Sequence, residues 1–189
     1  MPLILTETQE ADAPRIAEIH MAAFHDNAML LAQFPTSAIH AELFNTLVQK
    51  ARDEVRDPQW TVLVVHDEPG FQPQQQGTAE DGSGVGQGPR PAVWPAGTRF
   101  DILEDWTRRV KSVTSRVVGT RPCYNLSYIA TDPEHERHGA ASMLVKWGIE
   151  QAKKDGVLVA LESTKQGWPL ELGRPGRKLL YEMCFVWRP

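Results

Sequence analysis

The segment Glu136–Ser142 combines charged side chains with small residues directly ahead of an amphipathic stretch. Gly139 and the alanines after it would let the backbone approach a ligand closely. The first N–H groups of a helix have no intrahelical partner, and the helix dipole adds partial positive charge there. Arg137 and His138 add hydrogen-bond donors at the same end. The segment therefore predicts a site for a phosphate or pyrophosphate, although a plain strand-to-helix turn fits the small residues equally well.

Two side chains outside this segment could move a proton. Tyr128 lies on a predicted strand just before the glycine segment, and its hydroxyl could assist proton transfer. Glu162 ends a second predicted strand and could act as a base through a water molecule. A packed tyrosine and a solvent-facing glutamate are the simpler interpretations of these two residues. Cys123 and Cys184 have no Cys or His partner at ligand spacing, so we expect no metal site.

The elements that must position these residues alternate between strands and helices. The apolar periodicity predicts helices from Asp12 to Phe24 and from Thr36 or Ser37 to Val55, then at Asp101–Val118 and Ala140–Lys154. It predicts strands at Leu3–Leu5, Trp60–Val65, Tyr124–Ala130, Val157–Leu161 and Tyr181–Trp187. This order is typical of an α/β (α+β) fold.

Composition and length restrict the classes of protein. A chain of 189 residues suits one domain, here 1–189, and the Gly-, Pro- and Gln-rich stretch 69–98 predicts a long mobile loop inside it. The net charge of −4 disfavours nucleic acid as a partner. No apolar run approaches the length of a membrane span, and no signal peptide is evident, so we expect a cytoplasmic protein with no membrane partner.

The stretch Ile129–Leu144 resembles the acetyl-CoA-binding motif of the GNAT N-acetyltransferases. That motif reads Gln/Arg-x-x-Gly-x-Gly/Ala, and Glu136, Gly139 and Ala141 stand at its three defined positions. The flanking sequences are similar to those of fungal members. The resemblance implies a mixed, mostly antiparallel sheet flanked by helices, with acetyl-CoA as the cosubstrate.

The resemblance also implies how the cosubstrate would be held. The strand residues Ile129, Ala130 and Thr131 would pair with the pantetheine arm through their backbone. The amides of Arg137, His138, Gly139, Ala140, Ala141 and Ser142 would hold the pyrophosphate. The acceptor amine would then attack the thioester directly, so the protein mainly positions the reactants and removes a proton.

The sequence departs from the family pattern at three places. Glu136 replaces the usual Gln or Arg. The second motif, Tyr-x-x-x-Gly-Phe, supplies a tyrosine that protonates the leaving thiolate, and here Tyr181-Glu-Met-Cys-Phe185 is one residue shorter and lacks the glycine. Tyr181 is therefore either that acid or part of a final strand. A strand expected after His66 is not evident.

The leading hypothesis is an acetyl-CoA-dependent N-acetyltransferase that acts on an amine of a small molecule. The alternative is a degenerate GNAT fold that binds CoA, or a protein partner, and performs no chemistry. An open sheet edge would favour a homodimer.

Overall fold

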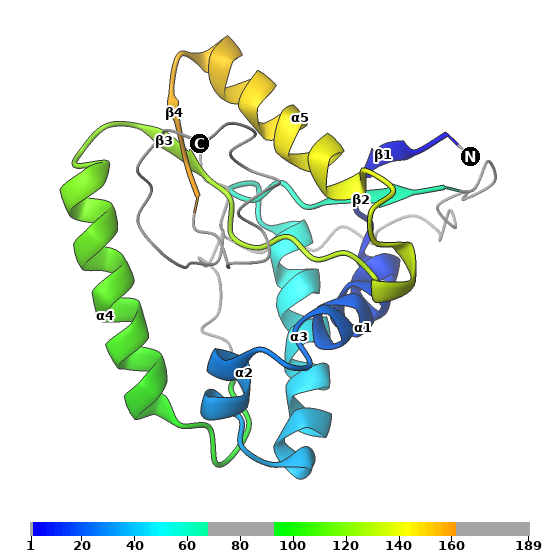
Figure 1. Cartoon of the computed structure of the whole chain (residues 1–189), viewed down its shortest axis with the longest axis vertical. Helices are drawn as coiled ribbons and strands as arrows, with labels where there is room; N and C mark the ends of the chain where they lie inside the picture. Colours follow the sequence, from blue (N-terminus) through cyan, green and yellow to red (C-terminus); the bar gives the residue numbers. More distant parts are fainter. Residues whose placement is uncertain (1, 68–92, 162–189) are drawn as a thin grey trace, which may run out of the picture.

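The computed structural model describes residues 2–67 and 93–161. Its described elements are five α-helices, two short 3-10 turns and four short strands (Figure 1). The helices are α1 (Ala13–Ala23), α2 (Ala28–Gln33), α3 (Ser37–Arg56), α4 (Phe100–Val117) and α5 (Ala140–Asp155). The strands are β1 (Ile4–Glu7), β2 (Leu63–His66), β3 (Cys123–Asn125) and β4 (Leu158–Ala160), and the 3-10 turns are η1 (Glu10–Asp12) and η2 (Pro133–His135). The mixed α/β content agrees with the fold class expected from the sequence.

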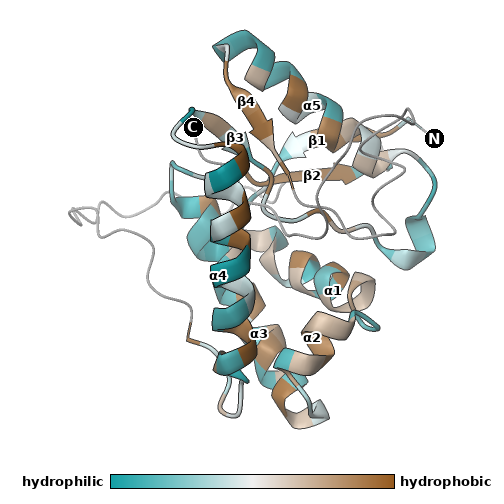
Figure 2. Ribbon diagram, turned by 60° about the vertical axis from the view of Figure 1, so that its left-hand side comes forward, coloured by the Kyte–Doolittle hydropathy of each residue, from teal (hydrophilic) through white to brown (hydrophobic). Residues whose placement is uncertain are grey.

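The described strands form two separate pairs. Strand β1 runs antiparallel to β2, with Leu5 opposite Val65, and β3 runs parallel to β4, with Tyr124 opposite Val159. Helix α5 contacts β2 on one side and β3 and β4 on the other, so it joins the two pairs (Figure 1). Figure 2 shows that β2 and β4 are rich in hydrophobic residues. The burial of such residues against a helix provides most of the stability of short strands.

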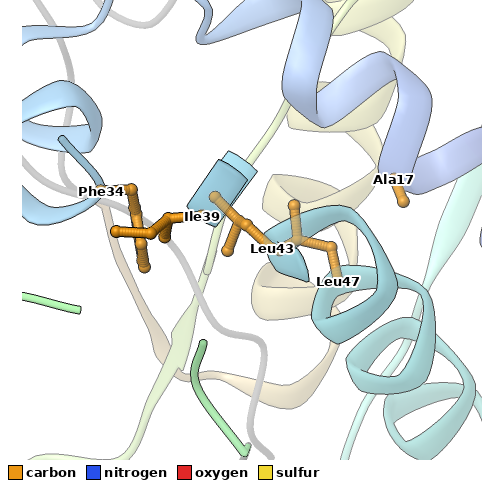
Figure 3. Close-up of a cluster of buried hydrophobic side chains, with 5 residues drawn as sticks. All are labelled: Ala17, Phe34, Ile39, Leu43 and Leu47. Atoms are coloured by element: carbon orange, nitrogen blue, oxygen red, sulfur yellow. The ribbon is translucent and has the colours of Figure 1, made fainter. Parts of the chain in front are cut away.

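The buried core of the described residues lies among α1, α2 and α3 rather than beneath α5. Figure 3 shows its five side chains: Ala17, Phe34, Ile39, Leu43 and Leu47. Three of them recur every four residues along α3, as expected for the buried face of an amphipathic helix. Helix α3 begins where the Thr36 side chain accepts a hydrogen bond from the Ile39 amide. The predicted start at Thr36 or Ser37 is therefore confirmed.

Several predicted boundaries are wrong. The strand predicted at Tyr124–Ala130 is described as the shorter β3, Cys123–Asn125, which pairs with the three residues of β4. The helix at Ala28–Gln33 was not predicted, since it is short, and the Asn27 side chain starts it by accepting from the amides of Met29 and Leu30. Asp12 precedes α1 as predicted, but its carboxylate accepts from the Gln9 amide instead of capping that helix.

The end of the predicted mobile loop is packed. The Trp94 ring lies 5.8 Å from the Phe34 ring, and Thr98 is buried with its hydroxyl donating to the Pro95 carbonyl. The Arg99 amide donates to the Gln33 carbonyl and connects this segment to α2. The aromatic ring of Trp94 thus anchors this end of the Gly- and Pro-rich stretch to the core. The rest of that predicted loop, 69–92, lies outside the described residues.

Candidate functional site

The turn that leads into α5 is held by contacts of the Asp132 carboxylate. The Asp132 side chain accepts from the Glu134 amide and so begins η2. The same carboxylate forms an ion pair with Arg15 of α1, which fixes the turn against the N-terminal helix. The Glu134 hydrogen bond and Arg15 both lower the pKa of Asp132 below its usual value, the hydrogen bond more strongly. Asp132 thus fixes where η2 begins.

Two residues of the following loop have left-handed backbone conformations. Arg137 has a φ of 68°, and Gly139, the residue before α5, has a φ of 94°. A left-handed conformation costs a residue with a Cβ on the order of 1–2 kcal/mol, whereas glycine adopts it freely. Gly139 therefore allows the chain to turn sharply from the exposed loop into the helix.

The N-terminus of α5 is open and has no side-chain cap. Helices α2 and α3 are capped by the side chains of Asn27 and Thr36, but Gly139 has no side chain to bond the first amides of α5. A Cβ placed on Gly139 would meet nothing within 4 Å, so the space next to these amides is free. Amides at a helix N-terminus with open space in front of them suit an anionic ligand. These residues therefore fit the pyrophosphate of CoA.

The charged side chains of the loop stand at this same end. Glu136, Arg137, His138 and Gly139 are exposed, and so is Ser142, while Ala140 and Ala141 are half-buried. The structure thus brings the predicted anion-binding residues together at the start of one helix. The cationic side chain of Arg137 attracts a phosphate and the carboxylate of Glu136 repels it. The attraction of a phosphate to the backbone amides does not depend on these side-chain charges.

The segment before the turn, Ile129–Thr131, has few backbone partners among the described residues. The β3–β4 ladder ends where the Leu126 amide donates to the Ala160 carbonyl at 3.1 Å. Within the described part of the chain, Ile129, Ala130 and Thr131 make no backbone–backbone hydrogen bond. All three are half-buried. An extended segment with unused amides and carbonyls can pair with the amide groups of a pantetheine arm.

An apolar crevice lies between α5 and the β3–β4 pair. It is lined mainly by aliphatic side chains: Leu126, Leu144, Val145, Ile149, Val159 and Leu161, together with Tyr124 and Gly148. The lining is suited to an aliphatic or thioether group rather than to a charged one.

Tyr128 packs between α1 and α3. Its ring lies edge-on to His20, with the ring centroids 5.1 Å apart, and the Lys50 ammonium is 5.3 Å from its centroid. Lys50 also lies 5.6 Å from the Trp60 ring and forms an ion pair with Glu54 one turn later. A cation over two aromatic faces is held by the negative charge of both π systems. The structure thus surrounds Tyr128 with titratable side chains.

Burial changes the titration of two of these side chains. Desolvation, helped by the charge of Lys50, lowers the pKa of His20 to about 4, so the imidazole is neutral at pH 7. The Nδ1 atom of His20 is buried and has no hydrogen-bond partner among the described residues. Desolvation also raises the pKa of Glu54, and Lys50 opposes that effect only in part. Groups with shifted pKa values gathered around one tyrosine are a common mark of a functional site.

The sequence prediction missed His20, Lys50 and Glu54. One signal was present: Glu54 falls on the buried stripe of α3, and Lys50 precedes it by one helical turn. A charged residue at a buried position with an opposite charge four residues away indicates a paired, half-buried group. No comparable signal identifies His20, because its contact with Tyr128 joins distant parts of the chain.

The other two predicted catalytic residues, Glu162 and Tyr181, lie outside the described residues, as does Cys184. Among residues 2–67 and 93–161, no group of three His, Cys, Asp or Glu side chains could hold a metal ion. No described helix is both long enough and apolar enough to cross a membrane.

Comparison with known proteins gives one match. Residues 95–167 match the model of the acetyltransferase (GNAT) family, which is less than half of the chain. The matched range includes the Tyr128–Thr131 segment, the turn and the whole of α5. No curated protein and no solved structure is significantly similar to the chain. Residues 95–167 are therefore similar to the GNAT acetyltransferase family.

Proposed function

We propose that this protein is an acetyl-CoA-dependent N-acetyltransferase that transfers the acetyl group directly to an amine of a small molecule. The observation that carries the proposal is the open N-terminus of α5 behind Gly139. It follows the segment Ile129–Thr131, which makes no backbone–backbone hydrogen bond with the described residues. One end of this arrangement suits a pyrophosphate and the other suits an amide-containing arm, as in coenzyme A.

The residues of the site would act chiefly by positioning the two reactants. The amides of Ala140, Ala141 and Ser142 would bind the pyrophosphate, with Arg137 and His138 beside them. The backbone of Ile129–Thr131 would hold the pantetheine arm in line with Tyr128. Fixing a thioester and an amine in contact removes much of the entropic part of the barrier.

Proton transfer would complete the reaction. A protonated amine cannot attack a thioester, so the acceptor must lose a proton before or during attack. Tyr128 directly precedes the segment that would hold the pantetheine arm. Its hydroxyl is our candidate for relaying that proton. Glu162 as a base acting through water and Tyr181 as the acid for the leaving thiolate remain predictions from the sequence.

Release of the CoA thiol in the presence of a panel of small amines tests this proposal. We expect at least one amine to be acetylated, and Tyr128→Phe to lower kcat about 100-fold or more with little change in acetyl-CoA affinity. Asp155→Asn is the control, because it changes a side chain at the opposite end of α5 from the proposed pyrophosphate site. Binding of acetyl-CoA without turnover of any amine would instead support a CoA-binding module.

A further inference from the structure

The amine of Lys50 occupies a prepared environment beside Tyr128. It lies over the rings of Trp60 and Tyr128 and is paired with Glu54. The Lys50 side chain is 29% exposed, whereas the Glu54 side chain is only 9% exposed. An amine that contacts two aromatic rings and a buried carboxylate is held in a narrow range of positions.

The carboxylate next to this amine is suited to receive its proton. Burial raises the pKa of Glu54 more than the charge of Lys50 lowers it. A carboxylate of raised pKa in hydrogen-bond contact with an ammonium group is a better proton acceptor than an exposed one. Lys50 and Glu54 therefore form an amine–carboxylate pair in direct contact.

The pair also lies beside the proposed position of the thioester. Tyr128, which contacts Lys50, directly precedes the segment Ile129–Thr131 that would hold the pantetheine arm. Figure 1 shows the chain between β3 and η2 passing close to α3. The Lys50 amine therefore contacts the residue that directly precedes the proposed pantetheine-binding segment.

We infer that Lys50 is an internal acceptor, whose side-chain amine takes the acetyl group from acetyl-CoA. This inference rests on the proposed function. Glu54 takes one proton from the ammonium, and Nζ attacks the thioester carbon. The new C–N bond forms, the C–S bond breaks, and the CoA thiolate takes up the second amine proton. The products are Nε-acetyl-lysine and free CoA.

Acetylation of Lys50 would change the electrostatics of the whole cluster. It removes the positive charge that stands over the Tyr128 ring and that pairs with Glu54. It also removes one of the two influences that lower the pKa of His20. The modified protein would therefore present a neutral amide where the unmodified one presents a cation.

Mass-spectrometric mapping of acetylated lysines after incubation with acetyl-CoA tests the inference. Lys146 is the matched control, because it also pairs with a glutamate one turn later but is 78% exposed, with no aromatic wall described around it. We expect Lys50 to be acetylated at least about tenfold faster than Lys146. Glu54→Gln should slow labelling of Lys50 and leave Lys146 unchanged.

Acetic anhydride gives the chemical comparison, since it should label the exposed Lys146 at least as readily as Lys50. Labelling of Lys50 by acetyl-CoA no faster than Lys146 would overturn the inference. Calorimetric binding of acetyl-CoA to the same sample separates the two failures. Binding without labelling of Lys50 refutes the internal acceptor and leaves the proposed function standing. Absence of binding refutes both.

Discussion

Arg15 on α1 forms an ion pair with Asp132, which lies 117 positions later in the chain, at the turn before α5. The N-terminal helix therefore supports the loop that would hold the CoA pyrophosphate. Asp132 lies inside the range 95–167 that matches the acetyltransferase model, whereas Arg15 lies outside it. The conformation of the turn therefore depends on a residue that the match does not cover. The helical layer α1–α3 contributes both the buried core and this anchor.

Removing the anchor should weaken cosubstrate binding. Asp132→Ala removes the ion pair with Arg15 and the hydrogen bond from the Glu134 amide. The turn then loses its preferred conformation, and we expect the Kd for acetyl-CoA to rise severalfold. Asp132→Asn can still accept from the Glu134 amide and should show a smaller loss. Equal affinities in all three proteins, measured by calorimetry, would contradict this role.

His20 should make the protein less stable in mild acid. Its pKa in the folded protein is about 4, below the ordinary histidine value of 6.5, so the unfolded chain binds a proton between these pH values and the folded protein does not. The stability is therefore complete above about pH 6.5 and falls as the pH drops toward 4. The loss from this residue between pH 7 and pH 5 is on the order of 1–2 kcal/mol.

Urea denaturation at pH 7 and pH 5 measures this effect. His20→Gln should remove it, so the variant loses less free energy of unfolding on acidification than the original protein. His25→Gln is the control, because His25 is exposed at the end of α1. An identical pH dependence in the original protein and in His20→Gln would show that His20 does not titrate as described.

The core among α1–α3 should dominate the stability of the described structure. Leu43 is the largest side chain that is fully buried there, with 1% of its surface exposed. Leu43→Ala leaves a cavity and should lower the free energy of unfolding by about 2–5 kcal/mol. Leu31→Ala on α2 removes the same atoms from a residue that is 41% exposed, and should cost far less. Chemical denaturation of both variants gives the comparison.

The sequence predicted most of the elements that position the site. The i, i+4 stripe of α3 and the glycine before α5 are local signals, so periodicity and a single residue type were enough to place them. The length of β3 was not predictable from its own residues, because the extent of a strand depends on its partner β4. The packing of Trp94 against Phe34 was hidden by the Gly- and Pro-rich composition around it.

The candidate site was predicted only in part for the same reason. The anion-binding residues are consecutive in the chain, so their spacing identified them. His20, Lys50 and Glu54 come from two helices and meet Tyr128 only in the folded protein. Contacts between residues so far apart are fixed by tertiary packing, which a periodic pattern does not record.

The most direct test of the account is calorimetric titration with acetyl-CoA of the original protein and two variants, with ATP and NAD as comparison ligands. Gly139 and Gly156 stand at opposite ends of α5, both with left-handed φ and with no atom within 4 Å of an added Cβ. Aspartate tolerates such a conformation better than most residues, so the two substitutions differ mainly in where they add negative charge.

We predict selective binding of acetyl-CoA by the original protein and by Gly156→Asp, and abolished binding by Gly139→Asp, because its carboxylate occupies the phosphate position and repels it. Unfolding curves of both variants confirm that each is folded. Undiminished binding by Gly139→Asp, or no binding by the folded original protein, would contradict the placement of the cosubstrate at the N-terminus of α5.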